Sequence, residues 1–246
     1  LIVRWVTKDR EPHFGLLAAT GGVTHTTYLE YCDIDVVDVD PSSDLGAVYE
    51  SLRNDPIVEA VEVDSWMYSH DASFYPGEEG GDGGDSGPWS MEKIEAPAAW
   101  RLLGANDSAL SRAIVAVIGT GIQYNHSSLA AQMWMNPGEI PGNGIDDDGN
   151  GYVDDVYGYD FYNDDGDPYD DNGHGTHCAG TIGAVWSDAG SISVAPRVRL
   201  MALKFLSGSG SGSTSDSVLA LNYALSFNAP ISSNSYGGGG SSSARQ

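Results

Sequence analysis

A glycine-rich acidic stretch divides the chain. Pro76–Pro88 holds six glycines, four acidic residues and no apolar residue. Such a composition cannot pack a core, so we predict a flexible linker. The chain therefore separates into a first segment of residues 1–70, a linker of residues 71–88 and a second segment of residues 89–246.

The charge of the chain limits its partners. With 35 acidic and 11 basic side chains, the net charge is −24. Nucleic acids and anionic membranes attract Lys/Arg patches, so neither is expected as a partner. There is no run of about 18 apolar residues, so we expect no membrane span. The acidity suggests instead a protein that needs counter-cations.

The first segment shows a β-α-β-β-α-β pattern, which is the order of a small ferredoxin-like α+β domain. The second helix is the clearest element, because Leu45, Val48, Tyr49 and Leu52 form one apolar face. The expected strands and helices are Leu1–Thr7, Pro12–Ala19, Val23–Tyr31, Ile34–Asp40, a helix between Pro41 and Asn54, and Ile57–Val63.

The second segment alternates strand and helix signals. Ala113–Ile118 and Val198–Leu203 are continuous apolar runs, which is typical of strands covered on both faces. A helix is predicted over Ser213–Asn228, followed by a strand at Pro230–Ser235. This pattern predicts an α/β fold with a mostly parallel sheet and with ligands at the carboxyl ends of the strands.

The strongest chemical signal is the run Asn172–Ala184, which reads Asn-Gly-His-Gly-Thr-His-Cys-Ala-Gly-Thr-Ile-Gly-Ala. His174 and His177 stand among small residues at the start of a predicted helix. A histidine there is well placed as a general base. Taken alone, His-Gly-Thr-His is equally compatible with a structural histidine or a metal-binding pair.

The full run resembles the histidine motif of the subtilisin-like serine proteases. Other segments resemble further parts of that family. Trp89–Trp100 resembles its mature N-terminal helix, and Ala113–Gly121 resembles the strand and turn that carry its aspartate. Val194–Pro196 and Met201–Gly212 resemble its third strand and one substrate edge, and Ser233–Gly238 resembles the other edge. The resemblance implies an incomplete doubly wound parallel sheet, preceded by an inhibitory propeptide in residues 1–70. It makes His174 the triad histidine, while we expect His177 to be packed.

Two departures from the family pattern concern catalysis. Gly119 occupies the position of the triad aspartate, and a Gly-Thr-Ser nucleophile motif is absent from the sequence. Loss of the aspartate function costs roughly 10⁴-fold in kcat. We therefore expect the chain as written to be inactive.

The resemblance also implies that an extended peptide binds as a strand between two edges. These edges match Gly210, Ser211 and Gly212 on one side, and Ser235, Tyr236 and Gly237 on the other. The expected partner is a polypeptide substrate or the chain's own propeptide, whose tail around Tyr68–Tyr75 would point to the cleft. We expect a monomer.

An acidic loop predicts a calcium site. Residues 146–151 fit the pattern D-x-D-x-N-G, which places alternate oxygens around one point. The expected ligands are Asp146, Asp148, Asn150, the backbone carbonyl of Tyr152, and Asp155 (or Asp154). An EF-hand needs a glutamate where Tyr157 stands, so the loop is not an EF-hand. A second site within Asp160–Asp171 is left open.

The two cysteines cannot form a disulfide framework. We expect Cys178 to be a buried free thiol and Cys32 to be a strand residue.

Three functions remain open. The first is a fragment of a secreted, calcium-dependent subtilisin-like endopeptidase precursor. The second is a non-catalytic relative that binds peptides or calcium, and the third is an inhibitor that acts in trans through the first segment.

Overall fold

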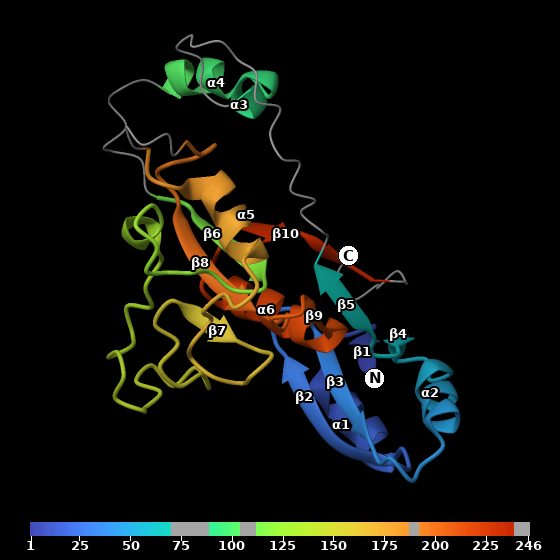
Figure 1. Cartoon of the computed structure of the whole chain (residues 1–246). Helices are drawn as coiled ribbons and strands as arrows, with labels where there is room; N and C mark the ends of the chain where they lie inside the picture. The colour runs from blue at the N-terminus through green and yellow to red at the C-terminus, as the bar shows by residue number, and fades with distance from the viewer. Residues whose placement is uncertain (70–88, 104–111, 187–191, 239–246) are drawn as a thin grey trace.

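The computed structural model describes residues 1–69, 89–103, 112–186 and 192–238 (Figure 1). The predicted linker of residues 71–88 lies outside these residues. Within the described part, each helix is too short or too polar to cross a lipid bilayer.

The first domain is a four-stranded antiparallel sheet with two helices. Its strand order is β2-β3-β1-β4, and the predicted order of elements is confirmed. Aspartates begin both helices: Asp9 caps α1 and Asp44 caps α2 through backbone N–H groups. The elements are β1 (Ile2–Trp5), α1 (Arg10–Ala19), β2 (Val23–Leu29), β3 (Ile34–Val39), α2 (Leu45–Arg53) and β4 (Val58–Glu62).

The turn between β2 and β3 starts earlier than predicted. β2 ends at Leu29, and the N–H of Asp33 donates to the carbonyl of Leu29 at 2.8 Å. Asp33 has φ +59°, which closes the hairpin tightly. Cys32 therefore lies in a turn, and the expectation that it is a strand residue is wrong.

The second domain is built on a parallel sheet of order β10-β6-β8-β7. This confirms the expected doubly wound α/β type. Its elements are α3 (Trp89–Lys93), α4 (Ala96–Leu103), β6 (Ile114–Gly119), the short 3₁₀ helix η2 (Ala130–Gln132), β7 (Gly158–Asp160), α5 (His174–Gly183), β8 (Arg199–Lys204), β9 (Ser211–Ser213), α6 (Thr214–Ser226), β10 (Ile231–Asn234) and β11 (Tyr236–Gly237).

The two central strands are covered on both faces, which explains their continuous apolar sequences. Alternate residues of β6 and β8 belong to two different cores. Ile118 and Leu203 pack with Tyr223 of α6, whereas Val117 and Leu200 pack with residues of α5. Figure 1 shows these two helices on either side of the sheet.

The segment before the sheet forms two helices rather than the single one predicted over Trp89–Trp100. Glu95, between α3 and α4, has φ +58° and interrupts the helix. In Figure 1 both helices stand apart from the sheet. One link is the indole of Trp100, which donates to the carbonyl of Val194 at 2.8 Å and packs edge-on against Trp186.

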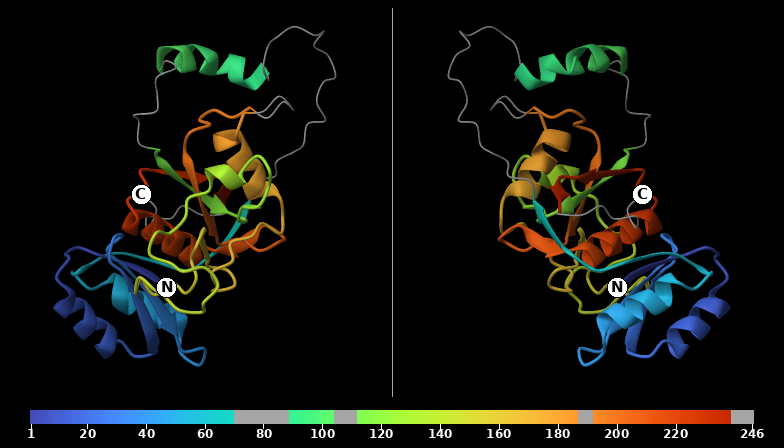
Figure 2. Two further views of the ribbon diagram at one scale, coloured as in Figure 1. Left: turned by 90° about the vertical axis from the view of Figure 1, so that its left-hand side faces the viewer. Right: turned by 90° about the vertical axis from the view of Figure 1, so that its right-hand side faces the viewer.

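The first domain rests on helix α6 of the second (Figure 2). Ile2, Leu29 and Ile34 form one buried cluster with Val218, which is fully buried. The N–H of Tyr31 donates to Oδ1 of Asn222 at 2.9 Å. The two domains therefore share an apolar contact that removes residues of both from water.

Candidate functional site

His174 is the first residue of α5, close to the carboxyl ends of β6 and β8. Gly173 precedes it with φ +104°, a conformation that favours glycine. The N–H of His174 donates to Oδ1 of Asn172 at 3.2 Å, and its ring is half-buried. Its Nε2 lies 3.9 Å from Sγ of Cys178, one helical turn later.

Asp170 positions the start of α5. It accepts hydrogen bonds from the backbone N–H groups of Asn172, Gly173 and Thr176, and from the hydroxyl of Thr176 at 2.6 Å. Burial disfavours the charged carboxylate, but these hydrogen bonds outweigh it, so the pKa of Asp170 is lowered. Asp170 therefore stays ionised and acts as a fixed anchor in front of His174.

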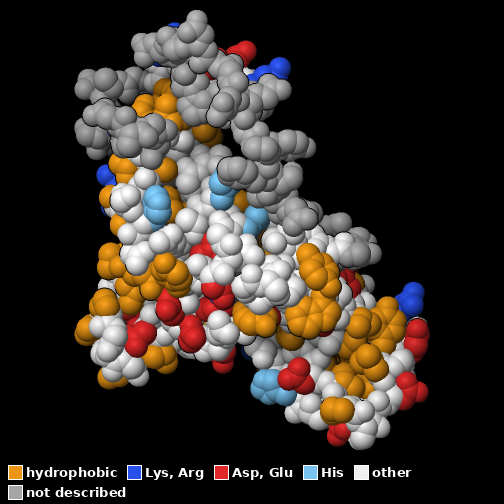
Figure 3. All heavy atoms as spheres, viewed as in Figure 1, with side chains coloured by type: hydrophobic (Ala, Val, Ile, Leu, Met, Phe, Trp, Pro, Cys, Tyr) orange, Lys and Arg blue, Asp and Glu red, His pale blue; other side chains and the backbone are white. Residues whose placement is uncertain are grey.

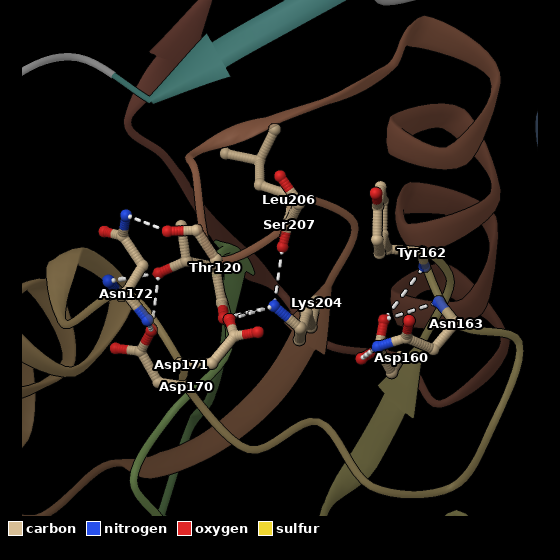
Figure 4. Close-up of polar contacts among 12 residues, drawn as sticks. Thr120, Asp160, Tyr162, Asn163, Asp170, Asp171, Asn172, Lys204, Leu206 and Ser207 are labelled. Carbon is tan, nitrogen blue, oxygen red and sulfur yellow. Dashed lines mark hydrogen bonds and ion pairs between the residues drawn. The ribbon is translucent and has the colours of Figure 1, made fainter.

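Thr120 joins this anchor to the sheet. Its hydroxyl donates to Oδ1 of Asp170 at 2.9 Å and accepts the N–H of Gly175 at 2.8 Å (Figure 4). A side chain at Gly175 would collide with the carbonyl of Gly121, so the glycine is needed for this close approach. Sequence analysis missed Asp170 and Thr120, because the N-cap position itself is Gly173 and only the fold brings both side chains to the start of α5.

Gly119 ends β6 where the family pattern has an aspartate. Its carbonyl accepts the N–H groups of Phe205 and Leu206 at 3.0 and 3.1 Å. A Cβ built on Gly119 meets nothing within 4 Å. The space for the missing side chain therefore remains open and has not been filled by neighbours.

Lys204 is a buried cation next to this position, because it pairs with Gly119 in the parallel register. Its side chain is 2% exposed, and its Nζ donates to Oδ1 of Asp171 at 2.7 Å. Two carbonyls, of Thr120 at 3.1 Å and Leu206 at 2.7 Å, complete its shell (Figure 4). All three ammonium hydrogens thus have acceptors, which offsets the cost of burial. Sequence analysis missed this residue.

A short strand of the first domain lies between the two predicted substrate edges. β5 (Trp66–Ser69) pairs antiparallel with β9 on one side and with β11 on the other. The paired residues are Tyr68 with Ser211, Met67 with Gly212, Ser69 with Tyr236, and Tyr68 with Gly237, while the N–H of Ser69 donates to the carbonyl of Gly210 at 2.8 Å. Of the six predicted edge residues, Ser235 alone makes no pair with β5, because it lies between β10 and β11.

The side chains of β5 alternate between solvent and protein. Met67 is 1% exposed, whereas Trp66 and Tyr68 are 60% and 55% exposed. Met67 packs in one cluster with Phe205 and Tyr236, whose rings meet edge-on at 4.6 Å. β9 and β11 therefore hold β5 between them, and Met67 is the residue of β5 that packs into the apolar core.

The residues just before β5 cap helix α6. Asp64 accepts the N–H of Ser215 at 2.9 Å and its hydroxyl at 2.5 Å. The N–H of Thr214 donates to the carbonyl of Ser65 at 2.8 Å. A carboxylate is favourable at a helix N-terminus, so this contact fixes the entry of β5 into the cleft.

The acidic loop separates into two roles. Asp146 closes the turn, since it accepts the N–H groups of Gly149, Asn150 and Gly151. These bonds, led by that from Gly151, lower the pKa of Asp146. Its carboxylate is therefore engaged by the backbone of its own loop.

Three other carboxylates converge on one point. Atoms of Glu139, Asp148 and Asp155 lie within 4.8 Å of one another. Glu139 is 9% exposed and its buried Oε2 has no hydrogen-bond partner, while Asp155 is fully buried. Burial raises the pKa of Asp155. Like charges this close disfavour each other's ionised form, and carboxylate oxygens are the ligands that Ca²⁺ prefers, so these residues could hold that ion.

The other predicted calcium ligands lie at different places. Asn150 is beside the cluster, and its Nδ2 donates to Oδ2 of Asp155 at 2.9 Å. The ring of Tyr152 packs edge-on against Tyr159 and Tyr223, while the role predicted for its backbone carbonyl stays a prediction. Sequence reasoning missed Glu139, because only the fold brings it to the loop. The hydroxyl of Tyr223 donates to Asp155 at 2.6 Å, which ties the cluster to α6.

In the second acidic stretch, Asp160 is almost completely buried. Its carboxylate accepts the N–H groups of Tyr162 and Asn163 and the amide of Asn163 (Figure 4). Burial nevertheless raises the pKa of Asp160. Its hydrogen bonds are local, so this part of the stretch already satisfies its own carboxylate.

Two expectations about α5 need correction. Cys178 is half-buried rather than buried, and it is free, as is Cys32. His177 is exposed rather than packed. His177 therefore faces solvent, whereas Cys178 packs against the core that contains Ala179.

The sequence of this chain matches those of known proteins. Residues 111–246 match the model of the Subtilase family. Subtilisin-like protease 1 of Plasmodium vivax is 36% identical over 150 residues, which is 60% of this chain and 24% of that protein. Subtilisin-like protease 1 of Plasmodium falciparum (isolate 3D7) is 38% identical over 150 residues, 60% of this chain and 22% of that protein.

Thermitase of Thermoactinomyces vulgaris is 33% identical over 151 residues, which is 61% of this chain and 44% of thermitase. The match to this chain thus spans about a quarter of the Plasmodium relatives and less than half of thermitase. The family model covers more than half of the chain, and the parallel sheet fits it. The chain belongs to the subtilase family.

Proposed function

We propose that this chain is part of a secreted, calcium-dependent subtilisin-like serine endopeptidase precursor, in which residues 1–69 block the substrate cleft. The observation that carries the proposal is the position of β5, which pairs with β9 and β11 on both sides. A strand that already fills both edges leaves no backbone groups there for a substrate strand. Residues 1–69 thus act as an inhibitory segment of the same chain.

The occupied cleft indicates the class of substrate. A substrate would bind as an extended polypeptide, with its backbone paired as β5 is. At the place of Met67 it needs an apolar side chain, because that pocket is lined by Phe205 and Tyr236. At the place of Ser69 it needs a small one, because Ser69 Oγ lies directly against Gly210.

Calcium has a structural role in this proposal. The converging carboxylates of Glu139, Asp148 and Asp155 would hold the ion, and the unpartnered Oε2 of Glu139 supports the fit. When bound, calcium supplies the positive charge that the cluster lacks. Asp155 would transmit the effect to α6 through its hydrogen bond to Tyr223. A secreted protein meets the high calcium concentrations that such extracellular sites use.

The chain as written would hold substrate without cleaving it. His174 would accept and return a proton, but Gly119 offers no carboxylate to orient the imidazole. Gly119 therefore favours a second candidate function, a non-catalytic subtilase relative that binds peptides. Both candidates predict the same cleft and differ only in catalysis.

Peptide binding by the full chain tests the proposal. In a Met67→Asp variant we expect β5 to leave the cleft. The synthetic peptide Asp-Ser-Trp-Met-Tyr-Ser, which copies residues 64–69, should then bind in the presence of calcium and protect the backbone amides of β9 and β11 from hydrogen exchange. The same peptide with aspartate in place of methionine is the control and should not bind.

The outcomes separate the ideas. Equal binding of both peptides, or of neither, contradicts the apolar pocket and the blocked cleft. Hydrolysis of the peptide by the chain as written contradicts inactivity. Binding without hydrolysis agrees with the proposal. A second variant separates the two candidate functions: Gly119→Asp, made in a protein that includes a Gly-Thr-Ser segment. If this variant hydrolyses the peptide, the peptidase is favoured over the non-catalytic relative.

A further inference from the structure

A cavity of about 770 Å³ opens beside the loop that follows β6, away from the peptide cleft. Segments far apart in the sequence line it, including the loop at Tyr124, the acidic loop and the stretch after β7. The residues that decide its chemistry are three tyrosines and four carboxylates: Tyr124, Tyr157, Tyr159, Asp154, Asp164, Asp165 and Asp167. It is distinct from the converging group of Glu139, Asp148 and Asp155.

The tyrosines form a fixed aromatic wall. The rings of Tyr124 and Tyr157 stack at 4.6 Å with an angle of 21° between their planes. The hydroxyl of Tyr124 donates to Asp167 at 2.9 Å, and that of Tyr159 donates to Asp164 at 3.0 Å. Burial and the neighbouring Asp167 raise the pKa of Tyr124 to about 12. The rings therefore remain neutral and are held in place by the carboxylates.

The cavity is negative and its charge is not balanced by protein. In the described part of the chain, the ion pairs join Arg53 to Glu50 and Lys204 to Asp171, and none involves a cavity carboxylate. In Figure 3, acidic and hydrophobic side chains gather together at the lower left, over the loops around β7, with no lysine or arginine among them. A cation entering this space would meet carboxylates and ring faces at once.

We propose that this cavity binds the arginine or lysine side chain of a polypeptide. A bare metal ion would use only a small part of the volume and gains nothing from tyrosine rings. A guanidinium is planar, pairs with carboxylates through two hydrogen bonds and stacks on aromatic rings. Each part of the lining then has a role: Asp154, Asp164 and Asp167 pair with the positive charge, and the tyrosine rings stack against the flat face of the guanidinium.

The site also lies near the helix of His174. The backbone N–H of Gln123, next to Tyr124, donates to the hydroxyl of Thr176 on α5 at 2.9 Å. A basic residue bound here would thus sit on the loop that joins β6 to α5. It would recognise a polypeptide independently of the apolar pocket of Met67, and this second contact point does not require catalysis.

Titration of the full chain with small probes tests the proposal, in saturating calcium so that metal sites are filled. The probes are N-acetyl-arginine methylamide and its neutral isostere N-acetyl-citrulline methylamide, followed by amide chemical shifts. We expect the arginine probe to shift Tyr124, Asp164 and Asp167, and to bind roughly tenfold more tightly than the citrulline probe. Asp164→Asn should weaken the arginine probe several-fold, and Glu59→Gln, an exposed acid of the first domain, should not.

Several results would overturn the idea. Equal binding of the two probes would show that charge is not recognised. No shift at about 10 mM probe, where even a weak single contact saturates, would show that nothing binds. Binding of the arginine probe in a parallel titration without calcium, and its loss in saturating calcium, would make the cavity a metal site. Tighter binding of spermidine than of the arginine probe would assign it to small polyamines instead of a polypeptide side chain.

Discussion

Met67 lies opposite Gly212 in an antiparallel register, and its side chain is 1% exposed while those on either side of it are more than half exposed. The glycine leaves room for the backbone of β5 to approach β9 closely. One buried methionine therefore anchors a strand whose two neighbouring side chains, Trp66 and Tyr68, face solvent. This contact adds to the backbone pairing that joins β5 to β9 and β11.

Replacing that anchor should release β5. In Met67→Asp, the buried cluster loses a methionine and would have to accept a carboxylate, which costs at least about 2 kcal/mol. We expect rapid hydrogen exchange at Gly212 and Gly237 and easier proteolysis after Ser65. Hydrogen exchange of the full chain, monitored by mass spectrometry, measures this.

Tyr68→Asp is the matched control for that experiment. It places the same charge one residue later on the same strand, where the side chain is exposed. We expect exchange at β9 and β11 to stay as in the parent chain. If both variants loosen the strand equally, backbone pairing alone holds β5 and the pocket of Met67 contributes nothing.

A carboxylate should fit at position 119. Because a Cβ on Gly119 meets nothing within 4 Å and φ is not positive, Gly119→Asp should change the free energy of unfolding by no more than about 1 kcal/mol. Gly121→Ala is the contrast, since Gly121 has φ +100° and a Cβ there lies 2.5 Å from the carbonyl of Pro168. Denaturant unfolding should show that Gly121→Ala is much less stable than Gly119→Asp. If Gly119→Asp is the less stable variant, there is no room for a side chain at position 119.

Calcium should stabilise the chain through Glu139. At about 100 times its dissociation constant, one bound ion adds about 2.7 kcal/mol. We expect Glu139→Gln to lower calcium affinity at least about tenfold in calorimetry, because it removes one charged ligand from the cluster. Asp146→Asn should instead lower stability equally with and without calcium, since Asp146 serves the turn. If Asp146→Asn abolishes calcium binding and Glu139→Gln does not, Asp146 is the main ligand.

The lowered pKa of Asp170 predicts a dependence of stability on pH. A carboxylate with a depressed pKa in the folded state stabilises the fold above its unfolded pKa of about 3.9. That contribution disappears as the pH falls through the lower, folded pKa. Asp170→Asn should therefore cost about 2 kcal/mol at pH 7 and progressively less below about pH 4. Unfolding measured across that range checks this, and a difference that does not shrink in acid would contradict it.

Much of the fold was predictable because the relevant signals are local. The apolar runs of β6 and β8, the apolar face of α2 and the small residues around His174 each reflect a repeat or turn encoded within a few residues. Gly210 and Gly212 were named from the family resemblance and not from a local signal; the structure places β5 beside them, and their role in binding substrate stays a prediction. The interruption at Glu95 was not predictable, because a positive φ at a non-glycine residue has no clear sequence signal.

The sequence by itself determined which carboxylates and which histidine are candidates for the site, and roughly where each strand ends. The tertiary structure alone decided which of them meet. It brought Glu139 to Asp148 and Asp155 while Asp146 turned to its own loop, and it buried Lys204 among three acceptors beside Gly119. The physical reason is that buried charges take their partners from whatever the packed backbone places nearby, and that choice is made between segments that are distant in the chain.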